Sequence, residues 1–260
     1  MKIIGIIPAR MASSRFPGKP LAKIDGIPMI GHVYFRSKMA NVLDEVYVAT
    51  CDNEIYNYIE SINGKAIITS DKHKRASDRT AEAMMKIEEE NGTKLDIVVM
   101  IQGDEPMLLP EMIDKSIEPL LKSKDIIVTN LMAPLNDSDE FEDPNEVKVV
   151  VDKKNFALYF SREPIPSRKK YDSNVPMQKQ VCIIPFRRDF LIKFNELEPT
   201  PLEIIESVDM LRLLEHGYKV KMVPVNYNTY SVDTNEDLNH VNDLMKNDTL
   251  IDSYRNKITI

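Results

Sequence analysis

Basic and small side chains gather in residues 8–21, directly after a short apolar run at residues 2–7. The segment carries Arg10, Arg15 and Lys19 together with two serines and a glycine. Backbone N–H groups that small residues leave accessible, surrounded by such cations, can cradle a polyphosphate. A solvated basic loop between a strand and a helix is the alternative interpretation, because a single motif match is often a false positive.

Two carboxylates stand where a metal ion could bind. Asp104 lies in the turn at residues 102–106, after the most apolar predicted strand, and Asp233 precedes a predicted final helix. Thr234 or Asn235 can cap that helix, which leaves Asp233 unexplained, and the turn around Asp104 could also be a capping turn. Mg²⁺ prefers hard oxygen ligands, typically one or two carboxylates plus substrate phosphates. Together with the basic segment, the two aspartates predict a nucleotide polyphosphate site that holds Mg²⁺.

Strands and helices that alternate along the first half must position these residues. The predicted strands are 2–7, 45–50, 65–69, 96–101 and 125–131, and the predicted helices are 28–40, 54–62, 77–91 and 110–122. This alternation predicts βαβ units and a parallel sheet, in which ligands bind beyond the carboxyl ends of the strands. We therefore expect residues 8–21 and 102–106 at one edge, and we predict that Ser77 or Asp78 caps the helix at 77–91.

The second half is richer in strands. We predict strands at 146–152, 156–162, 179–186 and 219–225, one long helix at 201–216 that Gly217 ends, and a capped helix from Asn235. The fold class is α/β, a Rossmann-like, mostly parallel sheet flanked by helices, with a smaller strand-rich lobe. We expect a single domain, with a nucleotide-binding half at 1–131, the lobe at 132–230, and a C-terminal metal-ligand turn and helix at 231–260.

Composition narrows the classes of function. A formal net charge of −7 argues against binding to duplex nucleic acid, which needs a basic surface. Cys51 and Cys182 match no metal-ligand or disulfide spacing and are expected to be free thiols. The sequence contains no run of about 18 apolar residues and no signal-peptide pattern, so we expect no membrane insertion and a cytoplasmic protein.

The chain resembles the 3-deoxy-manno-octulosonate cytidylyltransferases, the CMP-Kdo synthetases, nearly from end to end. Among the matching motifs are Gln102-Gly103-Asp104-Glu105-Pro106 and Val232-Asp233-Thr234. The other matching stretches are 6–10, 14–15, 17–21, 48–50, 78–79, 81–82, 147–150, 157–162, 199–203 and 236–238. Because many ordered matches stand at the family's spacing, the resemblance is specific.

The resemblance implies transfer of CMP from CTP to a sugar acid. It implies that the CTP phosphates are held by Arg10, Arg15 and Lys19. It implies that the cytidine is seated by Pro8, Ala9 and Gln102, and that Mg²⁺ is bound by Asp104 and Asp233. It further implies a homodimer, with residues 157–166 near the subunit contact.

Departures from the family fall on the acceptor pocket, to which the resemblance also assigns Arg79 and Arg162. The chain has Gln180 in place of His, Phe186 in place of Tyr, Asp209-Met210 in place of Glu-Gln, and Arg75-Ala76-Ser77 in place of Ser-Gly-Thr. Loss of polar groups at Phe186 and Met210 leaves fewer partners for sugar hydroxyls, whereas Arg75 adds a cation that suits a carboxylate or phosphate. We therefore expect that CTP use is retained and that the acceptor pocket is altered.

Several acceptors and functions stay open. The acceptor is the common acid Kdo or a variant such as its 8-amino form, and drift in a pocket that still binds Kdo would leave the same pattern. A nonulosonate or a phosphonate is the alternative within the enzyme class. A non-catalytic nucleotide-binding protein is the alternative outside it.

Overall fold

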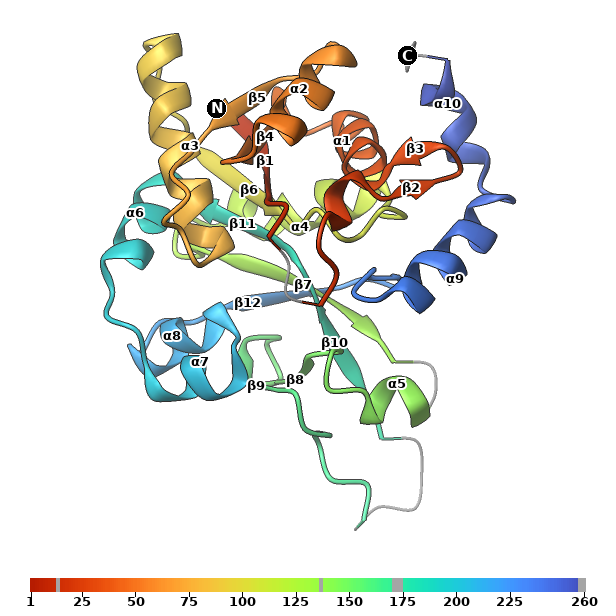
Figure 1. Cartoon of the computed structure of the whole chain (residues 1–260). Coiled ribbons are helices and arrows are strands. Elements are labelled where there is room, and N and C mark those ends of the chain that lie inside the picture. The colour runs from red at the N-terminus through yellow and green to blue at the C-terminus, as the bar shows by residue number, and fades with distance from the viewer. Residues whose placement is uncertain (13–14, 136–137, 170–174, 257–260) are drawn as a thin grey trace. The chain divides into compact units, whose positions relative to one another are not determined.

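The computed structural model describes residues 1–12, 15–135, 138–169 and 175–256. The chain forms two compact units, one made of Met1–Asp114 with Thr229–Ile260 and the other of Lys115–Asn228. Figure 1 traces the chain from the red N-terminal strand to the blue C-terminal helices. The first unit is therefore discontinuous in sequence, since its last segment returns to it from the far end of the chain.

Four strands of the first unit lie side by side and parallel in one sheet, in the order β6 (Ile97–Ile101), β1 (Ile3–Ala9), β4 (Glu45–Thr50) and β5 (Ala66–Ile68). Strands β1 and β6 are runs of apolar, largely β-branched residues and are buried almost throughout, as strands covered on both faces must be. The predicted parallel sheet is confirmed. Because all four strands run in one direction, their carboxyl ends share one edge.

Helices alternate with these strands. They are α1 (Met29–Lys38), α2 (Asn53–Ser61), α3 (Ala76–Asn91) and α4 (Pro110–Lys122), with η1 (Lys19–Leu21) and the hairpin β2 (Lys23–Ile24) and β3 (Ile27–Pro28) before α1. The predicted cap of α3 is wrong, because the helix begins earlier and its N-cap residue is Arg75. Ser77 and Asp78 instead lie within the first turn, where the negative charge of Asp78 favours the helix dipole.

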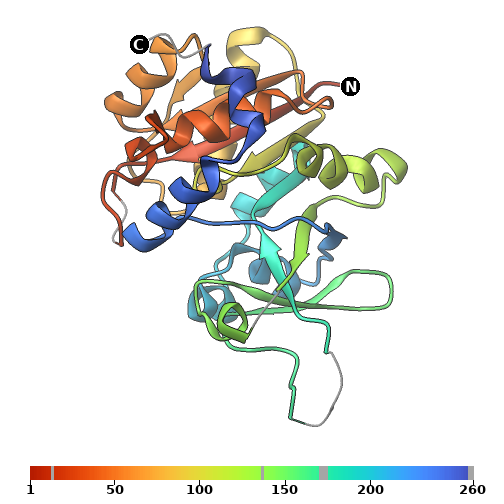
Figure 2. The ribbon, with the colours of Figure 1, turned by 90° about the vertical axis from the view of Figure 1, so that its right-hand side faces the viewer.

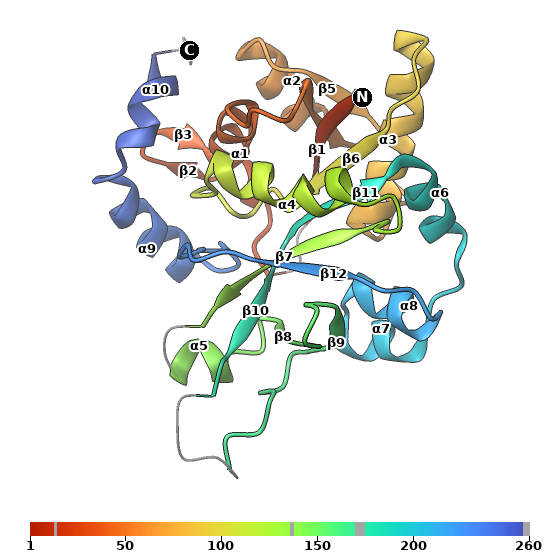
Figure 3. The same ribbon diagram turned by 180° about the vertical axis from the view of Figure 1, so that it is seen from behind.

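The C-terminal segment packs on the first unit through α9 (Asn235–Met245), η2 (Thr249–Ile251) and α10 (Asp252–Arg255). Figures 2 and 3 show these helices beside α1 and the β2–β3 hairpin. The predicted cap at Thr234 is confirmed, since its hydroxyl accepts the Asp237 N–H at 3.2 Å and the Asp237 carboxylate accepts the Thr234 N–H at 2.8 Å. Asp25 also donates its backbone N–H to Asn242 Oδ1 at 2.7 Å.

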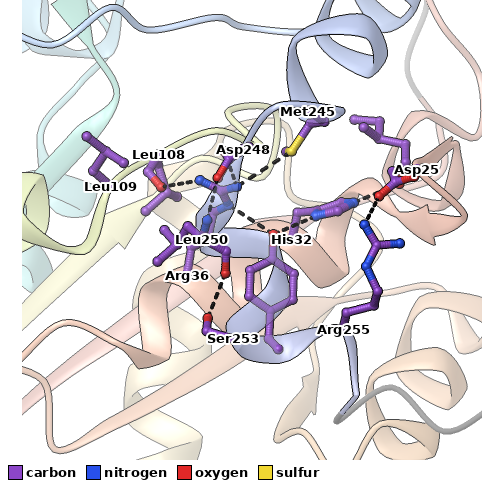
Figure 4. A network of polar contacts seen from close by, with 12 residues as sticks. Asp25, His32, Arg36, Leu108, Leu109, Met245, Asp248, Leu250, Ser253 and Arg255 are labelled. Carbon is purple, nitrogen blue, oxygen red and sulfur yellow. Dashed lines mark hydrogen bonds and ion pairs between the residues drawn. The ribbon is translucent and has the colours of Figure 1, made fainter.

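A buried polar network joins this segment to α1 (Figure 4). Arg36 is fully buried, and its guanidinium donates to Asp248 Oδ2 at 2.5 Å and to the Tyr254 hydroxyl at 3.1 Å. His32, also fully buried, contacts the same hydroxyl at 2.8 Å. A buried charge is tolerated only with partners, so these contacts fix where α10 and η2 can lie on α1.

The second unit holds a five-stranded sheet in the order β12 (Lys221–Pro224), β7 (Thr129–Pro134), β10 (Gln178–Val181), β8 (Lys148–Val151) and β9 (Ala157–Ser161). The β7–β12 pair is parallel and the other pairs are antiparallel. Its remaining elements are β11 (Ile183–Arg187), α5 (Ser138–Glu142), α6 (Arg188–Glu196), α7 (Pro201–Glu206) and α8 (Asp209–Glu215). Among the described residues, no helix has the length and apolar character needed to span a membrane.

Three predictions in this unit are wrong. The strand predicted at 179–186 is two strands, β10 and β11, and the strand predicted at 125–131 starts only at Thr129. The helix predicted at 201–216 is interrupted at Ser207, whose φ of 54° is left-handed. That interruption lets Arg212 fold back on Glu203, which accepts its Nε at 2.7 Å and a terminal nitrogen at 2.6 Å.

Candidate functional site

The carboxyl ends of β1 and β6 deliver two of the predicted segments to one edge of the sheet. Pro8 and Ala9 end β1, Arg10 follows as an exposed residue, and the turn that holds Gln102 follows β6. A Cβ atom at Gly103 would lie 3.0 Å from Ile30 Cδ1 and 3.6 Å from the Pro8 carbonyl oxygen. Glycine therefore lets the turn after β6 pack closely against Ile30 of α1.

Lys19 lies between the two predicted metal-binding aspartates. Its Nζ atom is 3.0 Å from Asp104 Oδ2 and 3.1 Å from Asp233 Oδ1. Arg15 adds a second cation, 2.9 Å from the same Asp233 oxygen. Burial disfavours the charged Lys19, but the Asp104 and Asp233 carboxylates outweigh it and raise the pKa of the lysine. Four of the predicted site residues are therefore brought together in one charged cluster.

Asp233 reaches this cluster because the C-terminal segment is attached to the turn after β6. The Val232 N–H donates to the backbone carbonyl of Asp104 at 2.9 Å. The Asp237 carboxylate accepts the Asp233 N–H at 2.9 Å and the Thr234 N–H at 2.8 Å. The capping box of α9 thus also fixes the backbone of Asp233. The Asp237 carboxylate therefore both starts the helix and holds Asp233 in place.

The basic segment contains a loop whose described ends are hydrogen-bonded to each other. Gly18 donates its N–H to the Met11 carbonyl at 3.0 Å, and its φ of 77° is a left-handed conformation that favours glycine. The Asp52 carboxylate accepts the Met11 N–H at 2.8 Å. Ser13 and Ser14, which the sequence places in this loop, lie outside the described residues. The closed loop carries Lys19 at its end, beside the two aspartates.

The two carboxylates fit a hard divalent cation. Both present an oxygen to one ammonium nitrogen, so the position between them already accommodates a positive charge. No group of three or more His, Cys, Asp or Glu side chains suited to a metal occurs in the part of the chain that the structure describes. Mg²⁺ commonly takes few protein ligands and completes its shell with phosphates and water. Asp104 and Asp233 are therefore the residues that would hold it, and this assignment stays a prediction.

Arg79 and Arg75, predicted to contact the acceptor, lie at the start of α3 in the first unit. Arg79 is 3% exposed and donates to the Thr69 hydroxyl and to Cys51 Sγ, 3.5 Å away. Arg75 is the N-cap residue of the helix. Although burial opposes ionisation, hydrogen bonds from Lys86, the Ser70 N–H and His73 lower the pKa of Glu82, on the same helix, to about 2. Through its bonds to Ser70 and His73, Glu82 thereby holds the polar loop that leads to Arg75.

Gln180 belongs to the second unit and has its amide oriented by a neighbour. Asn130 is fully buried, and its Nδ2 donates to the backbone carbonyls of Val181 at 2.6 Å and Leu131 at 3.2 Å. Because carbonyls only accept, Asn130 Oδ1 must be the atom that receives Gln180 Nε2, at 2.6 Å. Gln180 keeps its carbonyl oxygen as an acceptor and the second hydrogen of its amide nitrogen as a donor.

Three other predicted acceptor residues belong to the interior or to a helix start of the same unit. Phe186 is fully buried and its ring stacks on Phe194 with centroids 5.8 Å apart, and Met210 is fully buried in α8. Asp209 is the first residue of α8. Their place in an acceptor pocket stays a prediction.

Arg162 is held by the backbone of the second unit. Its Nε donates to the Glu206 carbonyl at 2.6 Å and a terminal nitrogen donates to the Pro144 carbonyl at 2.7 Å. The Glu206 carboxylate in turn accepts the Arg162 N–H at 2.8 Å and the hydroxyls of Ser161 and Tyr159 at 3.1 Å. The guanidinium is thus oriented by α7, and its contact with an acceptor stays a prediction.

Sequence reasoning missed three residues that hold the predicted ones in place: Asp52, Asn130 and Glu206. Asp52 had a usable signal, because it follows the carboxyl end of β4, where ligand-binding residues of parallel sheets gather. Asn130 and Glu206 had none, since their partners Gln180 and Arg162 are distant in sequence and only the folded chain brings them together.

Comparison with known proteins places the chain in a family. Residues 4–222 match the family model described as Cytidylyltransferase. The 3-deoxy-manno-octulosonate cytidylyltransferase of Fusobacterium nucleatum is 42% identical over 250 residues, covering 96% of this chain and 99% of the relative. That of Thermodesulfovibrio yellowstonii is 44% identical over 245 residues, covering 92% and 96%.

A solved structure gives the same result. It is a CMP:2-keto-3-deoxy-manno-octonic acid synthetase complexed with CTP, and it matches with a TM-score of 0.86 and 36% identity over 95% of this chain and 99% of that one. A 4-diphosphocytidyl-2C-methyl-D-erythritol synthase shares the fold at 16% identity, with a TM-score of 0.61. Because a family model and relatives of this identity both extend over most of its length, the chain belongs to the cytidylyltransferase family of nucleotidyltransferases.

Proposed function

We propose that this chain transfers CMP from CTP to the anomeric hydroxyl of a 3-deoxy-octulosonate-type sugar acid, in a Mg²⁺-dependent reaction that releases pyrophosphate. The observation that carries the proposal is the agreement of relatives named for this activity, which match more than 90% of the chain. A relative solved with CTP supports the choice of nucleotide. The chain is further proposed to act as a homodimer, with residues 157–166 near the subunit contact.

The residues of the first unit suit the chemistry of the nucleotide. Phosphoryl transfer depends on positioning and charge neutralisation, with little covalent chemistry for the protein to supply. Arg10, Arg15 and Lys19 would offset the charge that develops on the leaving pyrophosphate. Pro8, Ala9 and Gln102, at the ends of β1 and β6, would seat the cytidine. Bound between Asp104 and Asp233, Mg²⁺ would supply Lewis-acid polarisation of the phosphate.

The acceptor is proposed to be Kdo or a variant such as its 8-amino form. Arg79 and Arg75 would bind the acid, and Arg162, Phe186, Asp209 and Met210 would shape its pocket together with Gln180. Gln180, oriented by its bond to Asn130, keeps one amide hydrogen and its carbonyl oxygen for other partners. The carbonyl oxygen would accept from a hydroxyl or an ammonium group, so this residue suits either form of the acceptor.

Pyrophosphate release from each of the four ribonucleoside triphosphates tests this function. The reaction would be run with Mg²⁺ and, in turn, Kdo, 8-amino-Kdo, a nonulosonate, a phosphonate or no acid. We expect release from CTP with Kdo or its 8-amino form and background release otherwise. Release only with a nonulosonate or phosphonate would reassign the acceptor. No pyrophosphate release with any of the acids would favour a non-catalytic nucleotide-binding protein.

The metal assignment has its own test. Asp104→Asn and Asp233→Asn keep the side-chain shape but remove a negative charge that a divalent cation needs. Each should lower turnover by about a thousandfold or more and weaken Mn²⁺ binding, measured by electron paramagnetic resonance in the presence of CTP. Near-wild-type turnover in Asp104→Asn would remove this residue from the metal site.

A further inference from the structure

Asp52 is a helix N-cap residue that does not cap its own helix. It precedes α2 with extended backbone angles, φ −106° and ψ 121°, yet its side chain makes no capping hydrogen bond. Aspartate is among the preferred N-cap residues because its carboxylate can accept an N–H of the first turn, a contact that stabilises by about 1 kcal/mol. The carboxylate of Asp52 is therefore directed to another partner.

That partner is the loop predicted to hold the triphosphate. Asp52 Oδ2 accepts the Met11 N–H at 2.8 Å, and the Met11 carbonyl accepts the Gly18 N–H at 3.0 Å. Met11 is thus held on both sides, by β4 through Asp52 and by the far end of the loop through Gly18. Since Arg10 precedes Met11 and Lys19 follows Gly18, this pair of bonds fixes the backbone from which the two cationic side chains extend.

Asp52 is itself fixed to the end of β4. Its backbone N–H donates to the Thr50 hydroxyl at 3.1 Å, and Thr50 is fully buried at the last position of the strand. The thiol of Cys51 lies 3.6 Å from the same carboxylate oxygen that Met11 contacts. The anchor for the loop is therefore built on a rigid strand end, as precise positioning requires.

We propose that Asp52 is a positioning residue for CTP, which acts by fixing the Met11 N–H and so the backbone positions of Met11 and Gly18, next to Arg10 and Lys19. The proposal rests on the function proposed above. A carboxylate beside a triphosphate is electrostatically unfavourable as a direct contact, so Asp52 acts through the backbone of Met11. An ionised acceptor makes a stronger hydrogen bond to an N–H than a neutral one, which suits this role.

Two substitutions separate positioning from helix capping. Asp52→Asn keeps an oxygen at the same reach, so it retains the bond to Met11. Asp52→Ser can cap α2, but its hydroxyl is one bond shorter and does not reach Met11. Asp44→Ser is the matched control, because Asp44 accepts the Ile3 N–H at 2.7 Å at the opposite end of β1.

Steady-state kinetics and thermal unfolding of the full chain give the readouts. We expect Asp52→Ser to raise KM for CTP by about tenfold, the worth of one ordered hydrogen bond, with KM for the acceptor and the melting temperature unchanged. Asp52→Asn should stay within about threefold of wild type in KM for CTP. The Asp44→Ser control should leave KM for CTP unchanged.

Each other outcome overturns the proposal. An unchanged KM for CTP in Asp52→Ser, with or without a lower melting temperature, would reduce Asp52 to a structural residue. An equal rise in Asp52→Asn and Asp52→Ser would assign the effect to charge rather than to the bond with Met11. In both cases turnover of CTP by the wild type would leave the proposed function intact. If the wild type itself does not turn over CTP, the proposed function is refuted independently of Asp52.

Hydrogen exchange of the wild-type chain keeps the test decisive if Asp52→Ser fails to fold. The amide of Met11 should exchange slowly without ligand, because it is already bonded to Asp52. Exchange of this amide at the rate of an unprotected loop amide would remove the anchor on which the proposal depends.

Discussion

At the scale of single residues, the charges around Lys19 decide how the site is held before any ligand arrives. Its ammonium lies between Asp104 and Asp233, at 3.0 and 3.1 Å, and only 12% of its side chain is exposed. Two carboxylates this close would repel each other without a cation. Lys19 therefore supplies the positive charge that keeps both in place, at the position that a divalent cation would need.

Lys19→Met should strengthen metal binding in the absence of nucleotide, because the competing ammonium is gone. We expect Mn²⁺, followed by electron paramagnetic resonance without CTP, to bind about tenfold more tightly. Turnover should fall by about a hundredfold or more, since a cation near the leaving pyrophosphate is lost. Lys23→Met, an exposed lysine just beyond η1, should change neither quantity. Unchanged Mn²⁺ affinity in Lys19→Met would show that the ammonium does not compete with the metal.

His32 is a buried residue whose tautomer the structure defines. Its Nε2 lies 2.9 Å from the Ile24 carbonyl, which can only accept, so this nitrogen carries the proton. Its Nδ1 then accepts from the Tyr254 hydroxyl at 2.8 Å. Burial, followed by the nearby Arg36 charge, outweighs the bond to Ile24 and lowers the pKa of His32 to about 4. The folded protein therefore holds this ring neutral.

Because of His32, the unfolding free energy of the chain should decrease as the pH is lowered. Between its ordinary pKa of about 6.5 and the folded value, the unfolded chain binds a proton that the folded chain does not, so acid favours unfolding. We expect His32 to cost the wild type about 2 kcal/mol of unfolding free energy between about pH 7.5 and about pH 5. In His32→Gln this part of the pH dependence should disappear, as urea titrations at several pH values would reveal. An identical slope in both proteins would contradict the neutral assignment.

At the scale of elements, the C-terminal helices are placed by one buried ion pair. Arg36 on α1 is fully buried, and its partner Asp248, between α9 and η2, has a 12% exposed side chain. Asp248 also accepts the Leu250 N–H at 2.8 Å and so caps η2. The same carboxylate thus starts η2 and attaches it to α1, and the segment that carries Asp233 precedes it directly.

Asp248→Asn should destabilise the chain strongly, because it leaves the Arg36 charge buried without its counterion. We expect a loss of about 3 kcal/mol in unfolding free energy, measured with urea, and partial recovery in Arg36→Met with Asp248→Asn, where no charge remains buried. Asp243→Asn is the control, since Asp243 lies on the exposed face of α9 and pairs only with Lys246 among the described contacts. A small effect of Asp248→Asn would mean that this pair does not place the segment.

Local patterns predicted the elements of the first unit well and those of the second unit less well. Strand β4 of the first unit and helix α4, which runs from the first unit into the second, begin and end at the predicted residues. Each has one strong local signal, alternating β-branched residues in β4 and a regular apolar period in α4. The break between α7 and α8 was missed, since residues 201–216 keep a helical pattern through Ser207. The pair of Glu203 with Arg212 that the break permits is a tertiary contact, which no local pattern encodes.

Helix α6 was missed for a related reason. Residues 188–196 begin with Arg188 and Asp189 and offer only a short apolar face, of which Phe190, Leu191 and Phe194 are buried. Phe194 packs in the core against Phe186 from β11, whose ring stacks on it. The helix is therefore specified by packing against a neighbouring strand, which a reading of the sequence in single windows does not detect.

At the scale of the whole molecule, the chain returns to its first unit only after completing the second. Residues 229–260 pack with residues 1–114, so Asp233 joins Asp104 although a complete second unit separates them in sequence. The sequence pattern indicated two carboxylates that suit one metal ion. The sequence pattern did not indicate that Arg36 contacts Tyr254 and Asp248, and these contacts hold the returning segment in place.

The expected homodimer leads to the last prediction, on the last strand of the second sheet. Strand β9 is the last strand in the order of that sheet, and its second residue, Leu158, is 62% exposed. Because the family resemblance puts residues 157–166 near the subunit contact, Leu158 is expected to be covered by the second copy.

Leu158→Lys should therefore shift the protein from dimer to monomer. A charge placed in an apolar contact cannot be desolvated without a partner, so we expect at least about a hundredfold weaker dimerisation, measured by sedimentation equilibrium over a range of concentrations. Met85→Lys is the matched control, because Met85 is 48% exposed on α3 of the first unit, and it should leave the dimer intact. A wild-type monomer would refute the expected homodimer itself. A wild-type dimer that Leu158→Lys does not weaken would place the subunit contact on another surface, because the Leu158 side chain would then stay exposed to solvent in the assembled protein.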